Sequence, residues 1–137
     1  MITEQQIQSF IEGYLTAALW SSTDTCPQAE AEDMPEHTVN LDDYEWALDE
    51  AEKLHAGCIS FTNYAENALL QYSEEYKPNG FDVWECAGHD FWLTRNGHGT
   101  GFWDRGLGEL GKRLTEASKA FGTIDLYLGE DELVYVA

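Results

Sequence analysis

Basic residues are scarce in this sequence, and it also has little proline and no long apolar run. Only 7 Lys and Arg stand against 26 Asp and Glu, which gives a formal net charge of -19. Such a chain repels DNA, RNA and anionic membranes, so we expect no direct binding to nucleic acid or membrane. The first residues form neither a basic leader nor an uninterrupted apolar stretch, so we expect neither a signal peptide nor a membrane span.

Cysteine is also sparse, and no motif surrounds it. Cys26, Cys58 and Cys86 are odd in number and widely spaced, without a CxxC or Cys-His ligand spacing. This pattern predicts neither a disulfide framework nor a metal site, and it fits reduced thiols in a cytoplasm. The glycines do not form a phosphate-binding loop or a dinucleotide fingerprint, so the sequence predicts no cofactor.

The apolar residues that are present suffice for one folded unit. The hydrophobic share is 43% and the aromatic share 13% over 137 residues. A chain of this size buries roughly two-thirds of the surface that it exposes when unfolded. We therefore expect a single domain over residues 1–137.

The N-terminal part reads as three helices separated by one loop. Thr3 and Gln6 form a capping-box pattern before an amphipathic helix over residues 3–20. An acidic loop with two prolines follows over 21–38. Asn40 is the expected cap of a second helix over 41–56, and a third over 58–76 ends before Pro78.

The C-terminal part reads as a hairpin, a helix and a second hairpin. Asn96 and Gly97 separate two aromatic runs, which predicts a β-hairpin over about 88–104. A helix is expected over about 107–121 and a further hairpin over 123–136. The expected fold is therefore α+β: three N-terminal helices packed on a small, mainly antiparallel sheet, with the fourth helix crossing it.

Residues 88–106 are the densest source of candidate functional groups. His and Asp can act as general base and its orienting partner, although the predicted hairpin spreads them apart. Arg95 and Arg105 either recognise an anion or pair with the chain's own acids, such as Asp90 or Asp104. The aromatic pairs either form a stacking platform or supply core. The candidate ligand- or partner-binding residues are His89, Asp90, Trp92, Arg95, His98, Trp103 and Asp104, with Asp24 from the earlier turn.

The acidic charge is concentrated in the first half of the chain. Residues 1–76 carry 16 acids and one lysine, a net charge of -15. This surface either meets a basic partner or only keeps the protein in solution, and composition leaves both open. The candidate acidic face lies on the predicted second helix and consists of Asp42, Asp43, Glu45, Asp49, Glu50 and Glu52.

Three segments give a resemblance to a known family. They are ALWSSTD (residues 18–24), AGHDFWLTRNGHGTGFWDRG (87–106) and LYLGEDELVY (126–135). They resemble a family of small acidic proteins encoded by tailed phages and prophages of bacteria, for which no activity is established. The resemblance implies a protein made in a bacterial cytoplasm, and it pairs the 20–24 turn with the 88–106 segment as the places where a site would form.

Taken together, these features favour a non-enzymatic phage accessory protein. It would bind and modulate a bacterial host protein that has a basic surface, in one form as an acidic mimic of nucleic acid in an anti-defence or host-takeover role. The alternative is a small-ligand-binding protein or enzyme whose pocket is formed by the 88–106 hairpin and the 20–24 turn. A phage structural or assembly component is a third hypothesis.

Overall fold

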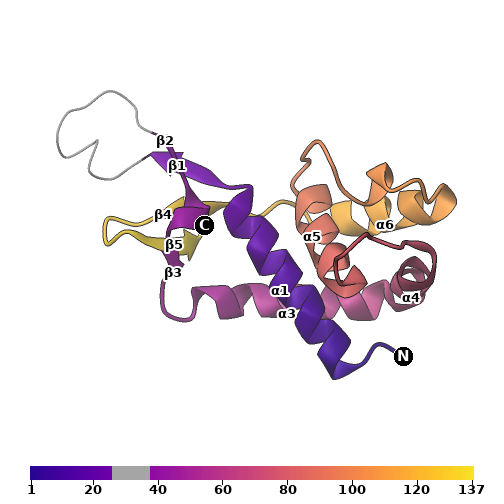
Figure 1. Cartoon of the computed structure of the whole chain (residues 1–137). Helices are drawn as coiled ribbons and strands as arrows, with labels where there is room; N and C mark the ends of the chain where they lie inside the picture. Colours follow the sequence, from indigo (N-terminus) through magenta and orange to yellow (C-terminus); the bar gives the residue numbers. More distant parts are fainter. Residues whose placement is uncertain (26–37) are drawn as a thin grey trace.

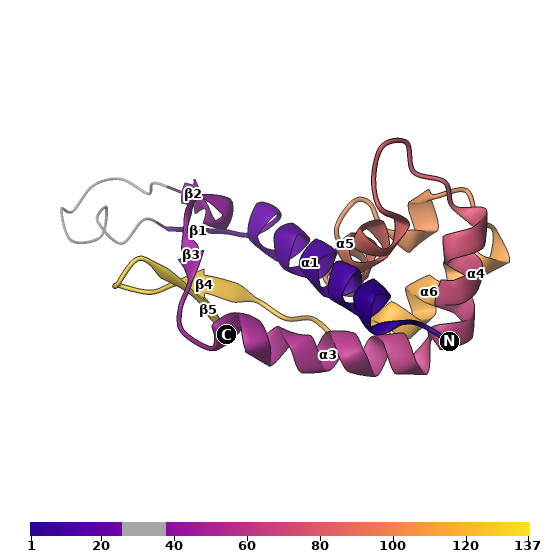
Figure 2. The same cartoon turned by 60° about the horizontal axis from the view of Figure 1, so that its bottom comes forward.

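The computed structural model describes residues 1–25 and 38–137, and the fold is α+β. The strands gather at one end of the molecule and α4, α5 and α6 at the other, with α1 and α3 extending between them (Figures 1 and 2). The elements in chain order are α1 (Glu4–Trp20), β1 (Thr23–Thr25), β2 (Thr38–Asn40), η1 (Leu41–Asp43), β3 (Glu45–Trp46), α3 (Glu50–Tyr64), α4 (Glu66–Glu75), α5 (Val83–Arg95), η2 (Phe102–Asp104), α6 (Glu109–Lys119), β4 (Leu126–Leu128) and β5 (Leu133–Val136).

The strands form two small sheets. β1 pairs antiparallel with β2. In the second sheet β5 lies between the other two strands, antiparallel to β4 and parallel to β3. The carboxylate of Asp24 in β1 accepts a hydrogen bond from the Leu128 amide of β4 at 2.7 Å, which ties the two sheets together.

Several predicted elements are confirmed. The Thr3 hydroxyl accepts from the Gln6 amide at 3.1 Å, and the Gln6 side chain accepts from the Thr3 amide at 2.9 Å. The helix predicted over 107–121 is α6, and the hairpin predicted over 123–136 is β4 and β5. Each of these segments has a clear period or cap of its own, so local sequence is enough to define it.

The helices predicted over 41–56 and 58–76 have different boundaries in the structure. Asn40 does cap, but it caps the short 3-10 helix η1, by accepting from the Asp42 amide at 2.9 Å. β3 then pairs with β5, and Asp49 adopts a left-handed conformation with φ of 67° before α3 begins. α3 runs through Gly57 to Tyr64, and α4 follows. Tertiary strand pairing therefore overrides the helical spacing of residues 41–49.

The hairpin predicted over 88–104 is wrong, because residues 83–95 form the helix α5. The Asp82 side chain caps this helix by accepting from the amides of Trp84 and Glu85 at 2.8 and 3.1 Å. Gly97 has φ of 70° and ends the helix, with its amide donating to Thr94 and the His98 amide to Leu93. This pair of bonds is a Schellman motif, so Asn96 and Gly97 close a helix here and do not turn a hairpin.

The predicted loop over 21–38 lies largely outside the described residues. Its two ends are visible as the paired strands β1 and β2. Residues 26–37, and with them Cys26, are not part of the chain that the structure describes. Cys58 and Cys86 are free thiols.

The core lies where α1, α3 and α5 meet. The Phe61 ring of α3 stacks on the Phe91 ring of α5, with centroids 3.9 Å apart and an interplanar angle of 10°. Phe10 and Tyr14 of α1 pack against Phe91 with centroid distances of 6.0 and 5.3 Å. Aromatic pairs at such distances add to the stabilisation that burial of their area gives.

Two glycines allow α1 and α5 to cross with their backbones in contact. A Cβ on Gly88 would lie 1.9 Å from the Phe10 carbonyl oxygen, and a Cβ on Gly13 would lie 1.9 Å from the Glu85 carbonyl oxygen. No side chain fits at either position unless a helix moves. The crossing thus depends on glycine for space.

We expect Gly88→Ala to lower the free energy of unfolding by at least about 3 kcal/mol, because its methyl group overlaps fixed backbone. Gly57→Ala is the matched control. It lies inside α3, and the nearest atom to its new Cβ is Nη1 of Arg95 at 3.8 Å, so it should be neutral or stabilise by up to about 1 kcal/mol through helix propensity. Urea unfolding of both variants measures this, and similar midpoints would contradict the crossing.

Candidate functional site

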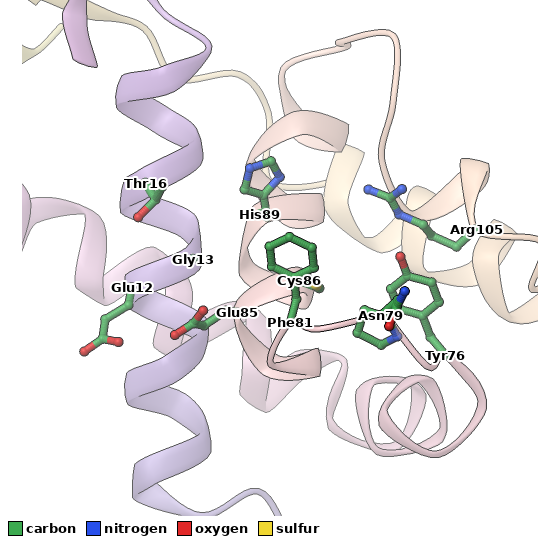
Figure 3. Close-up of a pocket in the computed structure, with 11 residues that line it drawn as sticks. Glu12, Gly13, Thr16, Tyr76, Asn79, Phe81, Glu85, Cys86, His89 and Arg105 are labelled. Carbon is green, nitrogen blue, oxygen red and sulfur yellow. The ribbon is translucent and has the colours of Figure 1, made fainter. Parts of the chain in front are cut away.

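A groove opens beside the crossing of α1 and α5 (Figure 3). It has a volume of about 900 Å³ and a mostly apolar lining. Pockets of this size and character are the usual sites of ligand binding. Its lining residues are Glu12, Gly13 and Thr16 from α1, Tyr76, Pro78, Asn79 and Phe81 from the connection between α4 and α5, Glu85, Cys86 and His89 from α5, and Arg105.

A buried carboxylate holds Arg105 at one side of this groove. Asp90 is fully buried. Its oxygens accept from Nη2 of Arg105 at 2.6 Å and from Nε at 3.1 and 3.2 Å. The Tyr72 hydroxyl donates a further hydrogen bond to Asp90 at 2.9 Å. This bidentate geometry fixes the plane of the guanidinium group.

Arg105 is therefore a positioned and largely neutralised cation. Its hydrogen bonds to Asp90 raise the pKa of Arg105 above its already high value, so the group stays charged. The guanidinium carbon lies 5.7 Å from the centroid of the Tyr76 ring, within the range of a cation-π contact. The interpretation of this arginine as a partner of the chain's own acids is confirmed.

His89 points into the same groove and is partly shielded from water. Its ring packs on Trp20 at the end of α1, with centroids 5.6 Å apart. Burial lowers the pKa of His89 below its usual 6.5; the nearby Asp90 opposes this shift and Arg105 adds to it. The imidazole is neutral at pH 7 as a consequence, so one ring nitrogen can donate a hydrogen bond and the other can accept one.

Cys86 contributes a thiol to the groove and not a nucleophile. Burial, followed by the charge of Asp90, raises the pKa of Cys86 above its usual value. A raised pKa leaves the group protonated, whereas nucleophilic attack requires the thiolate. The described groove lining therefore offers apolar surface, charge and hydrogen bonds, which are the elements of binding.

A second, polar cleft lies at the other end of α5. It has a volume of about 360 Å³ and brings Ser21, Ser22 and Thr23 against Trp92 and His98, with residues 123–126 and Asn96 completing it. The Trp92 indole donates to the Ser21 hydroxyl at 2.7 Å. The 20–24 turn and the 88–106 segment thus do meet, but through a helix end and not through a hairpin.

The other predicted site residues are dispersed. Arg95 is buried and donates to the carbonyls of Phe121 and Gly122 at 2.7 and 2.8 Å and to the Tyr14 hydroxyl at 3.1 Å, so it secures the end of α6 and does not reach a ligand. Asp24 supports β4 through the Leu128 amide. Asp104 accepts from the Thr100 hydroxyl at 3.3 Å in an exposed turn.

The residues that were predicted to line one common pocket therefore do not converge on a single site. His89 and Arg105 share the groove and Asp90 lies behind them, while Trp92 and His98 belong to the second cleft. Trp103 is 52% exposed on η2, whereas the neighbouring Phe102 is core. Of the predicted aromatic platform only Trp103 remains as open surface, because Trp84, Phe91, Trp92 and Phe102 are buried.

The sequence predicts the candidate acidic face as one side of a helix, but in the structure its residues lie in several elements. Asp42 and Asp43 lie in η1, Glu45 in β3, Asp49 before α3 and Glu52 in its first turn, all exposed. Glu50 is only 7% exposed, and its carboxylate meets Nζ of Lys53 at 2.7 Å, so it is not part of the open surface. The exposed acids nevertheless stay at one end of the molecule, because β3 and the start of α3 lie there (Figure 1).

The sequence does not identify several of the residues that line the groove. Glu12 and Glu85 look like ordinary solvated charges, and Tyr76 and Phe81 look like the boundary of a helix and a turn. One signal was available: Trp84, Ala87, Gly88, Phe91, Trp92 and Arg95 follow the i, i+3, i+4 spacing of a helix. That spacing, read with Asp82 as a cap, predicts α5 and a close approach at Gly88.

Within residues 1–25 and 38–137 no group of three or more His, Cys, Asp and Glu side chains is arranged to hold a metal ion. No helix in the same ranges is both long and apolar enough to cross a membrane.

Comparison of the chain with protein-family models, curated proteins and solved structures finds no match. The resemblance of residues 87–106 to phage-encoded proteins stays a prediction.

We expect Arg105→Gln to destabilise the protein more than Asp90→Asn. Removal of the arginine leaves a fully buried carboxylate whose remaining partner among the described residues is the Tyr72 hydroxyl. This change should lower the free energy of unfolding by about 3–5 kcal/mol. Asn at position 90 still accepts hydrogen bonds, and the Arg105 side chain is 24% exposed and can be hydrated. Asp90→Asn should therefore lower the free energy of unfolding by only about 1–2 kcal/mol. Urea unfolding at neutral pH measures both, and the reverse order would refute this account.

His89 should make stability depend on pH. Because its folded-state pKa lies below the unfolded value of 6.5, the unfolded chain binds more protons between the two values, and stability falls as the pH drops through that window. His89→Gln should lose less stability than wild type between about pH 7 and pH 5. His98→Gln controls for the loss of an imidazole, and equal pH slopes for His89→Gln and wild type would contradict the burial of His89.

Proposed function

We propose that this protein binds and modulates a bacterial host protein that presents a basic surface. The observation that carries the proposal is the gathering of exposed acids at the end of the molecule where the strands lie. We call Asp42, Asp43, Glu45, Glu130 and Asp131 the acidic sheet end, and all five are exposed. Three of the seven basic residues, Lys112, Arg113 and Lys119, lie instead on α6.

Strand register concentrates these acids. β3 runs parallel to β5, with Glu45 opposite Leu133, so the turn before β5 lies beside the residues that precede β3. Asp42 and Asp43 therefore precede β3 at the same end of this sheet at which Glu130 and Asp131 precede β5, although almost ninety positions separate the two pairs in sequence. Acids gathered at one end of a molecule produce a negative field, which attracts a basic partner and repels nucleic acid.

The mimic form of the proposal follows from the same field. A basic cleft that normally holds a phosphate backbone would accept a row of carboxylates in its place. The resemblance to phage-encoded proteins supplies the setting, since a phage protein that occupies such a cleft would inhibit a host defence or host enzyme.

A fourfold variant tests the acidic sheet end. Asp42→Asn, Asp43→Asn, Glu45→Gln and Glu130→Gln together should reduce retention of the host partner from bacterial lysate by about tenfold or more. The matched control changes four exposed acids elsewhere, Glu74→Gln, Glu75→Gln, Glu109→Gln and Glu116→Gln, with the same net charge. The control should retain the partner, and DNA should compete if the mimic form holds.

Salt provides the second readout of this experiment. Retention should fall between about 50 and 300 mM salt, because exposed charges are screened over that range. Retention that is equal in both variants and independent of salt would overturn the proposal.

The second candidate function is ligand binding in the polar cleft. It is favoured by one observation, the meeting of Ser21, Ser22 and Thr23 with Trp92 and His98 around a cavity of about 360 Å³. Hydroxyls, an imidazole and an indole edge suit a small polar ligand. A host-lysate experiment that retains no protein would favour this function over the first.

A further inference from the structure

The groove between α1 and α5 is a separate surface from the acidic sheet end, and its apolar lining is left open. Phe81 is 73% exposed, and it faces the groove together with Tyr76 and Asn79 (Figure 3). Trp20, 52% exposed, continues this aromatic surface past His89. Large exposed aromatic side chains around one cavity are typical of an interaction site.

The side chains that line the groove carry an excess of negative charge. Arg105 is committed to the buried Asp90, and these two groups cancel. His89 carries no charge at neutral pH, and Lys77 is adjacent to Pro78 in sequence but does not line the groove. Glu12 and Glu85 remain, and within residues 1–25 and 38–137 neither forms an ion pair. Figure 3 shows Glu85 reaching from α5 to α1, and Glu12 on α1 itself with its carboxylate directed away from Phe81 and Tyr76.

We propose that this groove binds a segment of a partner protein in which a large apolar side chain stands next to Lys or Arg. The apolar side chain packs against Phe81, Tyr76 and Pro78, and the cation lies by Glu12 and Glu85. Such a segment complements the groove in two ways. Its cation interacts with the two carboxylates, and its apolar side chain is removed from water against the apolar lining.

The exposed aromatic rim of the groove favours a protein segment over an enclosed small ligand, because Phe81 and Trp20 stay 73% and 52% exposed beside it. Its volume of about 900 Å³ lies near the upper end of the roughly 300–1,000 Å³ that ligand pockets occupy. It follows the surface of α1 and α5, as do grooves that receive peptide side chains from a partner. An anionic occupant is disfavoured, because the carboxylates of the lining and the net charge of -19 oppose it.

A peptide titration followed by backbone-amide NMR tests the proposal on the whole chain. The probe is the capped peptide KLFKG, compared with KGGKG, which keeps the charges without the apolar side chains, and with the charge-reversed ELFEG. KLFKG should shift the amides of Phe81, Glu85 and His89 and bind at least about fivefold more tightly than KGGKG or ELFEG.

Variants locate the binding. Phe81→Ala should weaken KLFKG binding at least about fivefold, and since Phe81 is largely exposed its truncation should leave the urea midpoint unchanged. Glu12→Gln with Glu85→Gln should weaken binding to a similar degree. The matched control, Glu109→Gln with Glu116→Gln, makes the same change in net charge on exposed positions of α6 and should bind as wild type does.

Each opposite result overturns the proposal. Equal binding of ELFEG would show that the sign of charge is wrong, and equal binding of KGGKG would show that the apolar lining is not used. Shifts centred on the acidic sheet end would place the peptide elsewhere. Concentration-dependent dimerisation that Phe81→Ala abolishes would make a second copy the occupant. The fourfold sheet-end variant should still bind KLFKG, so failure of the proposed host interaction leaves this result intact.

Discussion

The backbone contact between α1 and α5 at Gly13 and Gly88 is the constraint on which the other elements depend. It brings the two helices closer than side chains would permit and sets the direction of α5 through the core. With that direction fixed, Phe91 meets Phe61 of α3, and Asp90 faces Tyr72 of α4. Close packing transmits such a constraint, because a core of this density has no room for α5 to rotate.

The same helix supplies both cavities. Its first turns and His89 border the apolar groove, and its last turns border the polar cleft. Arg95 secures the end of α6 through backbone carbonyls, and Asp90 orients Arg105. The two arginines thus serve structural positions, and the open charges named on the groove and at the acidic sheet end are carboxylates. This division fits a protein that binds cationic surfaces at two places.

Sequence reasoning succeeded where local signals agree with the final structure. The capping box at Thr3, the amphipathic spacing of α6 and the alternation of β4 and β5 each identify their element. It was wrong for α5, because the aromatic pairs Phe91-Trp92 and Phe102-Trp103 on either side of Asn96 and Gly97 also suit a hairpin, and this local signal competes with the helical spacing. Asn96 with Gly97 suits a helix end as well as a hairpin turn.

The sequence by itself determined the excess of acids, the capping box of α1, the spacing of α6 and the final hairpin. Tertiary structure alone decided which charges remain available. It buried Glu50, neutralised Arg105 against Asp90, lowered the pKa of His89 and left Glu12 and Glu85 on an open apolar groove. The reason is physical: burial and pairing depend on neighbours that only the folded chain brings together, such as Asp90 with Arg105 and Glu12 with Glu85 on the groove.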